Sequence, residues 1–242
     1  MLNHLQQSLE TSLRKNQKSL NDQGKVLFEL SGVNVDYGDT RALNQVDLKV
    51  YKGEILFVSG VSGAGKTTLM KLLSGLATPT SGVMRSNSFH YSQGFFPAVV
   101  FQDLRLMGKY DLMTNLMVAY DPDLYRNKKE FEGDLMELAR YLGIKDKLNM
   151  RACDANGGLK QKVAIMRALL TRPEVLIADE PTSSLDLENS RRIFDLFHLY
   201  NNKRGVTVIW SSHNQELIKK FNGRIVHLDQ GKLVYSGQAC FT

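Results

Sequence analysis

A glycine-rich run separates two apolar segments in the first third of the chain. Residues 60–68 read Gly-Val-Ser-Gly-Ala-Gly-Lys-Thr-Thr, after a strand-like segment at 54–59 and before a helix-like segment at 68–73. The run matches the pattern G-x-x-x-x-G-K-[ST], whose glycines let the backbone turn tightly and bring its N–H groups to phosphate oxygens. A strand, this loop and a helix in succession predict a phosphate-binding loop, or P-loop, rather than a chance glycine-rich turn.

Two side chains of the P-loop have the chemistry that a magnesium nucleotide requires. Lys66 can reach the β- and γ-phosphates, and the Thr67 hydroxyl can bind Mg²⁺. The start of the following helix adds a partial positive charge at the same point. The remaining predicted phosphate contacts come from Gly60, Ser62, Gly63, Ala64, Gly65 and Thr68.

The composition excludes several other classes of protein. Cys153 and Cys240 have no motif spacing, so we expect neither a disulfide framework nor a zinc site. No apolar run approaches the ~18 residues that span a bilayer, and the N-terminus is too polar for a signal peptide. The net charge of +6 suits nucleotides, anionic lipid or nucleic acid, but no dense Lys/Arg block with aromatics points to nucleic acid. We therefore expect a cytoplasmic chain that reaches a membrane through a partner.

Hydrophobic periodicity divides the 242 residues into a polar N-terminal tail, 1–25, and one domain, 26–242. The tail has leucines at helical spacing, so its alternatives are a solvated segment and an amphipathic helix that touches a membrane or a partner. The domain begins with antiparallel strands, broken at Ser31-Gly32, and later alternates strands with helices, which predicts a parallel, helix-covered sheet. Helical spacing over about 104–156 predicts a helical subdomain inserted in this α/β core.

Polar side chains follow the apolar strands at the points where these end. Asp179 and Glu180 come after one strand, His213 after the next, and Gln102 after an earlier short strand. The carboxyl edge of an open α/β sheet is where ligands bind. There Asp179 and Gln102 can bind Mg²⁺, Glu180 can deprotonate an attacking water, and His213 can contact the γ-phosphate. Tyr37 offers an aromatic face to a nucleobase, with plain packing as its alternative.

From about Val26 to Tyr235 these segments resemble the ATP-binding cassette (ABC) ATPases. The resemblance implies an α/β P-loop NTPase fold with a mostly parallel sheet, an antiparallel β lead-in and a helical subdomain. The matching segments are Gly60–Thr67 for Walker A, Val175–Glu180 for Walker B, Gln102 for the Q-loop, Ser183–Asp186 for the D-loop, His213 for the switch histidine and Tyr37 for the A-loop.

The signature motif of that family is altered in this chain. Where the family usually shows Leu-Ser-Gly-Gly-Gln, residues 155–159 read Ala-Asn-Gly-Gly-Leu. The resemblance implies that Asn156, Gly157 and Gly158 complete the ATP site of a second subunit. The glycines still let a phosphate approach backbone N–H groups at a helix start, and the Asn156 amide can still donate a hydrogen bond.

A finer resemblance, carried by residues 99–106, 205–208 and 231–234, is to the cell-division ATPases of the FtsE type. It implies ATP and Mg²⁺ as cofactors, dimerisation on ATP with a second copy, and an FtsX-like permease partner in cell division and cell-wall hydrolase control. The place implied is the cytoplasmic side of the inner membrane, as a peripheral subunit.

Two other functions stay open at this point. One is the ATPase of a lipoprotein-release or macrolide-type exporter, and the other is an ATP-dependent scaffold that hydrolyses ATP weakly. A partner surface is expected where the helical region begins, with core packing as the alternative for the same side chains. Those side chains are Leu104, Leu106, Met107, Met113, Leu116 and Met117.

Overall fold

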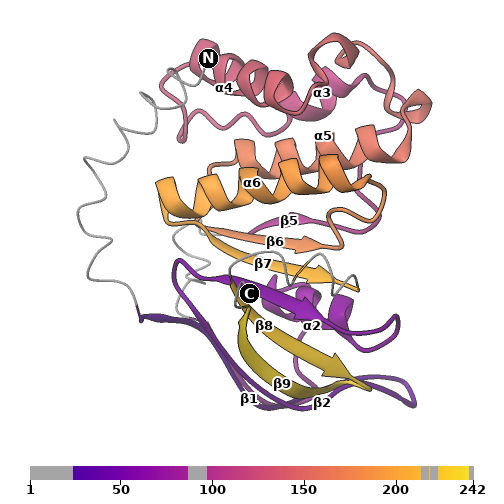
Figure 1. Ribbon diagram of the computed structural model, residues 1–242, viewed down its shortest axis with the longest axis vertical. Coiled ribbons are helices and arrows are strands. Elements are labelled where there is room, and N and C mark those ends of the chain that lie inside the picture. The colour runs from indigo at the N-terminus through magenta and orange to yellow at the C-terminus, as the bar shows by residue number, and fades with distance from the viewer. Residues whose placement is uncertain (1–23, 87–96, 214–217, 219–222, 240–242) are drawn as a thin grey trace.

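The computed structural model describes residues 24–86, 97–213, 218 and 223–239. Its elements stack in layers along the long axis: a helical region, two long helices, a six-stranded sheet, one more helix and a three-stranded sheet (Figure 1). The predicted tail, 1–25, lies almost wholly outside the described residues, so its two interpretations stay predictions. The arrangement is an α/β P-loop fold, as the sequence predicts.

The six-stranded sheet has the order β5-β6-β7-β3-β8-β9. The first five strands pair in parallel, and β9 closes the edge as an antiparallel hairpin with β8. β6 and β7 are buried along their whole lengths, as strands covered on both faces must be, and their polar residues stand at or near the strand ends. The strands are β3 (Ile55–Ser59), β5 (Ala98–Val100), β6 (Val175–Asp179), β7 (Thr207–Ser212), β8 (Gly223–Asp229) and β9 (Lys232–Ala239).

The second sheet is antiparallel, with the order β2-β1-β4. Its strands are β1 (Val26–Tyr37), β2 (Thr40–Tyr51) and β4 (Ser81–Ser86). The predicted break at Ser31-Gly32 is wrong, because β1 runs through these residues as one strand. At this point the register shifts in the pairing of β1 with both of its neighbours, β2 and β4. Gly32, with φ 56°, absorbs the local distortion. β4 was not predicted at all, since its six residues lack an apolar alternation.

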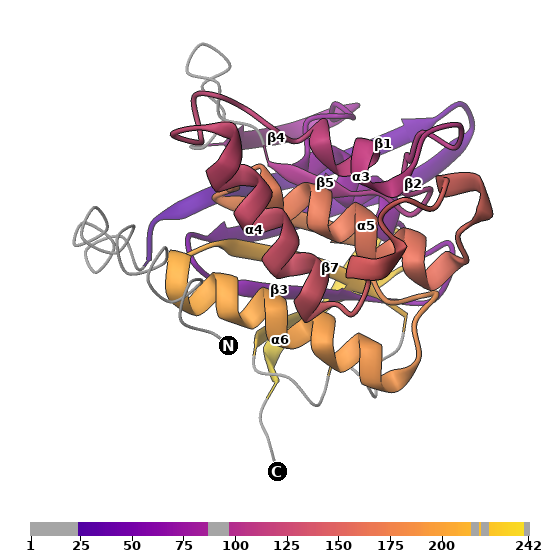
Figure 2. The same cartoon turned by 90° about the horizontal axis from the view of Figure 1, so that it is seen from above.

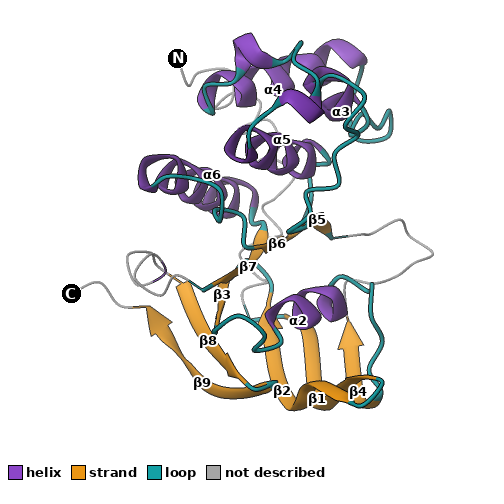
Figure 3. Cartoon of the chain, turned by 90° about the vertical axis from the view of Figure 1, so that its right-hand side faces the viewer, coloured by secondary structure: helices purple, strands orange, loops and turns teal. Residues whose placement is uncertain are grey.

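In the described residues, three helices pack directly on the six-stranded sheet. α2 (Lys66–Leu73) lies between the two sheets, whereas α5 (Gly157–Leu170) and α6 (Leu187–Arg204) cover the other face (Figure 3). Seen from above, α4 (Lys128–Tyr141) lies in front of α5, and α3 (Leu112–Met117) also packs on α5 (Figure 2). Short 3₁₀ turns at Lys145–Lys147 and Ala152–Asp154 join α4 to α5.

Side-chain caps fix where four of these helices begin. Asp111, Asn127, Asn156 and Asp186 each accept a hydrogen bond from a backbone N–H three residues on, which satisfies a donor that the helix leaves free. The bonds from Asn189 lower the pKa of the Asp186 carboxyl, because they favour its charged form. α6 therefore starts at Leu187, directly after its cap.

Two hydrophobic clusters hold the layers together. One, the helix-side cluster, joins the strands β3, β6 and β7 to α3–α6. It contains Phe57, Trp210, Phe194 and Phe197, whose contacting rings have centroids 5.4–6.2 Å apart. The other fills the space between the two sheets around α2. Burial of aromatic rings of this size is among the largest contributions to such a core. The sheet edge that carries the site is thus held rigidly from both faces.

Candidate active site

The P-loop joins β3 to α2 in a tight turn that two glycines make possible. Gly60 has φ 153° and Gly65, the N-cap of α2, has φ 104°. A Cβ atom on Gly60 would lie 2.5 Å from the Leu228 carbonyl oxygen, and one on Gly65 would lie 2.6 Å from the Ala42 carbonyl oxygen. Neither position can hold a side chain, because the backbone of each glycine packs directly against a strand. Gly60 packs on the six-stranded sheet and Gly65 on the three-stranded sheet.

Lys66 is buried and folds back over the loop. Its ammonium group donates to the carbonyl oxygens of Gly60, at 2.9 Å, and Val61, at 3.0 Å. It also lies 3.6 Å from Glu180 Oε1. A buried ammonium needs such partners, since an unpaired charge in this environment is costly. The lysine is therefore held between the loop backbone and the Glu180 carboxylate at the end of β6.

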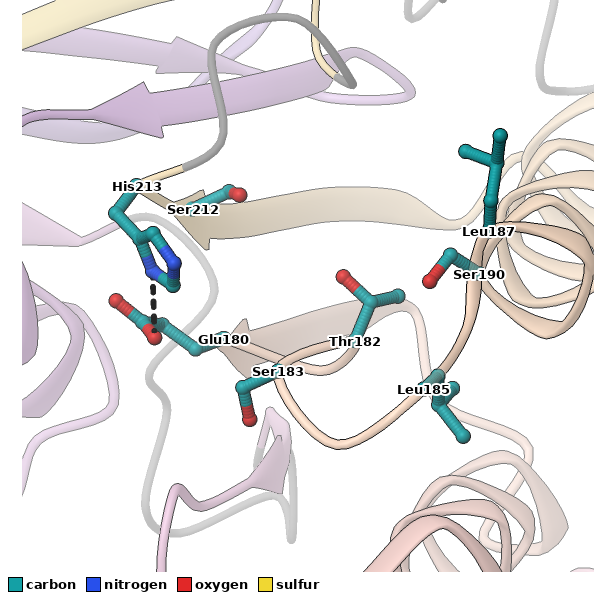
Figure 4. A pocket seen from close by; sticks show the side chains of 8 residues that line it. All are labelled: Glu180, Thr182, Ser183, Leu185, Leu187, Ser190, Ser212 and His213. Carbon is teal, nitrogen blue, oxygen red and sulfur yellow. Dashed lines mark hydrogen bonds and ion pairs between the residues drawn. The ribbon is translucent and has the colours of Figure 1, made fainter.

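The two carboxylates at the end of β6 have different surroundings. Asp179 is buried, and its Oδ1 accepts a hydrogen bond of 2.5 Å from the Ser211 hydroxyl. Glu180 has the left-handed φ of 49°, and its Oε2 lies 3.0 Å from His213 Nδ1 (Figure 4). The structure thus brings Lys66, Asp179, Glu180 and His213 to one edge of the sheet, as the strand ends predict.

Gln102 and Tyr37, the two other predicted site residues, are placed by the strands β5 and β1. β5 ends at Val100, which pairs with Ala178 on β6, so Gln102 continues toward the edge that carries Asp179. Tyr37 ends β1 with 51% of its surface exposed. The turn after it leads to Ala42, whose carbonyl oxygen meets the P-loop at Gly65. The exposed ring therefore stands at the end of β1, before the turn that leads to this contact.

Oxygen atoms suited to Mg²⁺ occur in this cluster. Thr67 lies in the first turn of α2, a helix that packs between the two sheets, and Asp179 ends β6 with a buried carboxylate. A hydroxyl, a carboxylate and the Gln102 amide oxygen form the hard donor set that Mg²⁺ prefers, usually with waters and substrate phosphates completing the shell. The residues present fit the ion.

The signature run has a different local role in the isolated chain. Asn156 caps α5, and its side-chain oxygen accepts a 2.8 Å hydrogen bond from the Leu159 N–H. A Cβ on Gly157 would lie 3.2 Å from the Ser184 side chain, and one on Gly158 would lie 3.0 Å from the Ser184 carbonyl oxygen. Leu159, which replaces the family's glutamine, is buried in the helix-side cluster. The glycines therefore also allow α5 to pack closely on the D-loop.

A pocket of about 210 Å³ lies beside the Glu180–His213 pair (Figure 4). The loop after β6 and the start of α6 form most of its wall. Its other lining residues are Thr182, Ser183, Leu185, Leu187, Ser190 and Ser212. The pocket extends from the predicted catalytic edge toward the D-loop, which the sequence predicts to contact a second subunit.

Most of the side chains predicted as a partner surface belong to the core instead. Leu116 is fully buried, and Leu104, Leu106, Met113 and Met117 pack against the helix-side cluster. Of the six, Met107 is exposed, and Tyr110 and Val118, three and eleven residues later in the sequence, are more exposed still. The core alternative is therefore correct for most of the set, because amphipathic spacing does not distinguish a helix face that packs inward from one that binds a partner.

Two further side chains of the site were not predicted. Ser211 and Gln161 bond the backbone of Glu180 from β7 and α5. A polar residue inside an apolar strand is the signal that could have singled out Ser211. Gln161 lies in a helix whose spacing gives no such signal.

Comparison with known proteins places this geometry in a family. Residues 43–183, more than half of the chain, match the sequence model of the ABC transporter family. The chain belongs to the ABC transporter family. It is 36% identical to the cell division ATP-binding protein FtsE of Mycobacterium tuberculosis, over 81% of this chain and 89% of that protein. The chain is therefore an ATPase of the ABC type.

Other relatives match over similar lengths. The lipoprotein-releasing system ATP-binding protein LolD of Bacteroides fragilis is 30% identical over 86% of this chain and 100% of its own length. The methionine import ATP-binding protein MetN of Lactobacillus johnsonii is 31% identical over 87% of this chain, which spans 64% of that protein. The dimeric structure of MJ0796, a bacterial ABC transporter cassette, superposes with a TM-score of 0.77 at 25% identity, over 89% and 100% of the two chains.

Proposed function

We propose that this chain is the ATP-hydrolysing subunit of an FtsE-like membrane complex, which closes as a pair on ATP and drives an FtsX-like permease partner. The observation that carries the catalytic part is the contact of Glu180 with both Lys66, at 3.6 Å, and His213, at 3.0 Å, beside the P-loop. A carboxylate between a phosphate-binding lysine and a histidine is placed to act on a water next to a γ-phosphate.

In this proposal each side chain of the cluster has one task. The P-loop N–H groups and Lys66 hold the phosphates, and Tyr37 stacks on the base. Glu180 takes the proton of the attacking water while His213 holds its carboxylate in place. Mg²⁺, held by Thr67, Asp179 and Gln102, would supply charge neutralisation when bound. Such positioning and electrostatic stabilisation account for most of the rate in phosphoryl transfer.

The second half of each ATP site comes from another copy of the chain. The start of α5 presents a helix N-terminus and two glycines, which together can approach an anion closely. A pair that exchanges these surfaces has two-fold symmetry, with P-loop against signature twice. The relative MJ0796, whose cassette was solved as a dimer, supports this part of the proposal.

The membrane partner is the finer part of the proposal. The described residues hold no helix that is both long and apolar enough to cross a bilayer. We therefore propose a peripheral subunit on the cytoplasmic side of the inner membrane, which docks through the exposed residues Met107, Tyr110 and Val118. The FtsE relative, at 36% identity, supports cell division and an FtsX-like partner. The LolD relative, at 30%, supports a lipoprotein-release or macrolide-type exporter as the second candidate.

Capture of the intact complex distinguishes these two candidates. The chain carries an affinity tag and is purified from native membranes in mild detergent, and its partners are identified by mass spectrometry. An FtsX-like protein in stoichiometric amount is the expected result, and a permease of the lipoprotein-release type would replace it. A Met107→Ser, Val118→Ser chain, with exposed side chains made polar, should lose the partner while keeping its ATP affinity.

Steady-state ATP turnover separates the enzyme from a weakly hydrolysing scaffold. Glu180→Gln keeps the size and hydrogen bonding of the side chain but not its basicity, so turnover should fall by about 100-fold or more. The matched control is Glu188→Gln, an exposed glutamate on α6 that pairs with Arg192. Equal turnover of the native chain and Glu180→Gln would remove Glu180 from this role.

A further inference from the structure

Glu180 has a backbone conformation that its sequence does not favour. Its φ of 49° lies in the left-handed region, which a non-glycine residue adopts only when its surroundings hold it there. It also follows directly after the buried β6, so its backbone N–H and C=O both need partners. What holds this residue therefore decides where its carboxylate points.

Ser211 holds the N–H side. It lies on β7 opposite Asp179 on β6, and it is 0% exposed. Its hydroxyl oxygen accepts from the Glu180 N–H at 2.9 Å, while its own O–H donates to Asp179 Oδ1 at 2.5 Å. One buried hydroxyl thus fixes the two neighbouring carboxylate residues relative to each other.

Gln161 holds the C=O side. It lies on α5, two residues after the signature run, and it is 1% exposed. Its Nε2 donates to the Glu180 carbonyl oxygen at 3.1 Å. The N–H of Ser183 reaches the same oxygen, also at 3.1 Å, and closes a turn after the strand. Both polar backbone groups of Glu180 are therefore bonded to buried side chains from different elements.

We propose that Ser211 and Gln161 are positioning residues that hold Glu180 in its left-handed conformation and so aim its carboxylate at the attacking water. The proposal depends on the proposed role of Glu180 as the base. Misplacement of a reacting group by about 1 Å costs on the order of 100-fold in rate, so a flexible Glu180 would bind ATP normally but hydrolyse it slowly.

The alternative is that these bonds serve stability alone, as buried hydrogen bonds do elsewhere. Thr207, at the other end of β7, provides a matched control for this alternative. It is also 0% exposed, and its hydroxyl accepts from the Gly53 N–H at 2.8 Å. Thr207→Val removes the same kind of bond from the same strand, but at the end of β7 that lies away from Glu180.

The experiment compares Ser211→Ala, Gln161→Met and Thr207→Val in the full chain. Each is measured for Tm, for ATP affinity by calorimetric titration, and for kcat and KM. The expected result is a kcat about tenfold lower in Ser211→Ala and Gln161→Met, with ATP affinity and KM within about twofold of native. Thr207→Val should keep its kcat although its Tm falls by a similar amount. If all three variants lose kcat only in proportion to Tm, the bonds are structural and the proposal is wrong.

A double-variant test ties the effect to Glu180. In a Glu180→Gln background, Ser211→Ala should lower the residual turnover no further, because the group that it positions is gone. If the two substitutions lower turnover additively, Ser211 acts elsewhere and the proposed positioning of Glu180 is wrong. If Glu180→Gln alone keeps native turnover, Glu180 is not the base. That result is distinct from a failure of Ser211 and Gln161 to position Glu180. If Ser211→Ala does not fold, Gln161→Met supplies the same comparison from α5.

Discussion

The two halves of the ATP site that we propose differ in how much one chain completes by itself. At the P-loop edge, side chains from three elements contact each other: Lys66, Glu180 and His213 lie within 3.6 Å of a partner in the cluster. At the signature run, the side-chain oxygen of Asn156 accepts the hydrogen bond that caps α5, and Gly157 packs on Ser184. The first half is charged and already assembled, whereas the second offers backbone groups on a helix start.

This difference explains which half departs from the family pattern. The charged cluster depends on specific side-chain functions, and each of its residues matches the family. The signature run depends on a cap and on two glycines, and a cap can be made by asparagine as well as by serine. The replacement of the family's glutamine by Leu159 is compatible with folding because that side chain packs in the core.

The largest effect is expected in the charged half, at Lys66. Lys66→Ala removes the ammonium that would pair with the phosphates, so ATP affinity should fall by about 100-fold or more. Calorimetric titration with ATP measures the loss. Lys71→Ala, an exposed lysine on the same helix, should bind as the native chain does. Micromolar affinity retained by Lys66→Ala would contradict the P-loop assignment.

A smaller effect, and one of a different kind, is expected at Gly158. Its added Cβ in Gly158→Ala would meet the Ser184 carbonyl oxygen at 3.0 Å and disturb both the D-loop and the close approach to a partner's phosphate. We expect turnover about tenfold lower, with ATP affinity of the single chain within about twofold. The control is Gly133→Ala on α4, which meets nothing within 4 Å and should stabilise that helix by about 0.5–1 kcal/mol. Loss of ATP affinity in Gly158→Ala would remove the contrast between the halves.

The smallest effect is expected at Asn156. Serine and asparagine cap helices about equally well, so Asn156→Ser should leave Tm within about 2 °C and leave turnover equal or higher. Asn156→Ala, which loses the bond to the Leu159 N–H, should cost about 1 kcal/mol of unfolding free energy. Thermal unfolding and steady-state turnover check both variants. A complete loss of turnover in Asn156→Ser would show that asparagine has a specific task at this site.

Contiguous motifs and strand ends carried most of what the sequence could predict. The P-loop is one unbroken run, and Asp179, Glu180 and His213 each end an apolar strand, so parallel pairing alone brings them to one edge. The hydrogen bonds that hold the backbone of Glu180 could not be predicted in this way. Ser211 and Gln161 meet it through the register of β6 with β7 and the packing of α5. The polar Ser211 stands out in its apolar strand, but no local pattern shows that it bonds Glu180.

The fold was less predictable where local signals conflicted. Ser31-Gly32 reads as a turn, yet pairing with two neighbouring strands keeps β1 continuous through it. Around 104–117 the apolar spacing predicted exposed and buried faces equally well. Tertiary packing decides this, since Leu116 faces the core while Met107 and Val118 remain exposed.

The mass of Glu180→Gln in solution tests the central claim, a site shared by two copies, most directly. This variant would bind ATP without hydrolysing it, so the closed pair should accumulate. Sedimentation should give the mass of one chain without nucleotide and of two chains with saturating Mg-ATP. The double variant Glu180→Gln, Gly158→Ala should stay largely single with ATP bound. A single chain in Glu180→Gln at saturating ATP, with binding confirmed by titration, would contradict the shared site.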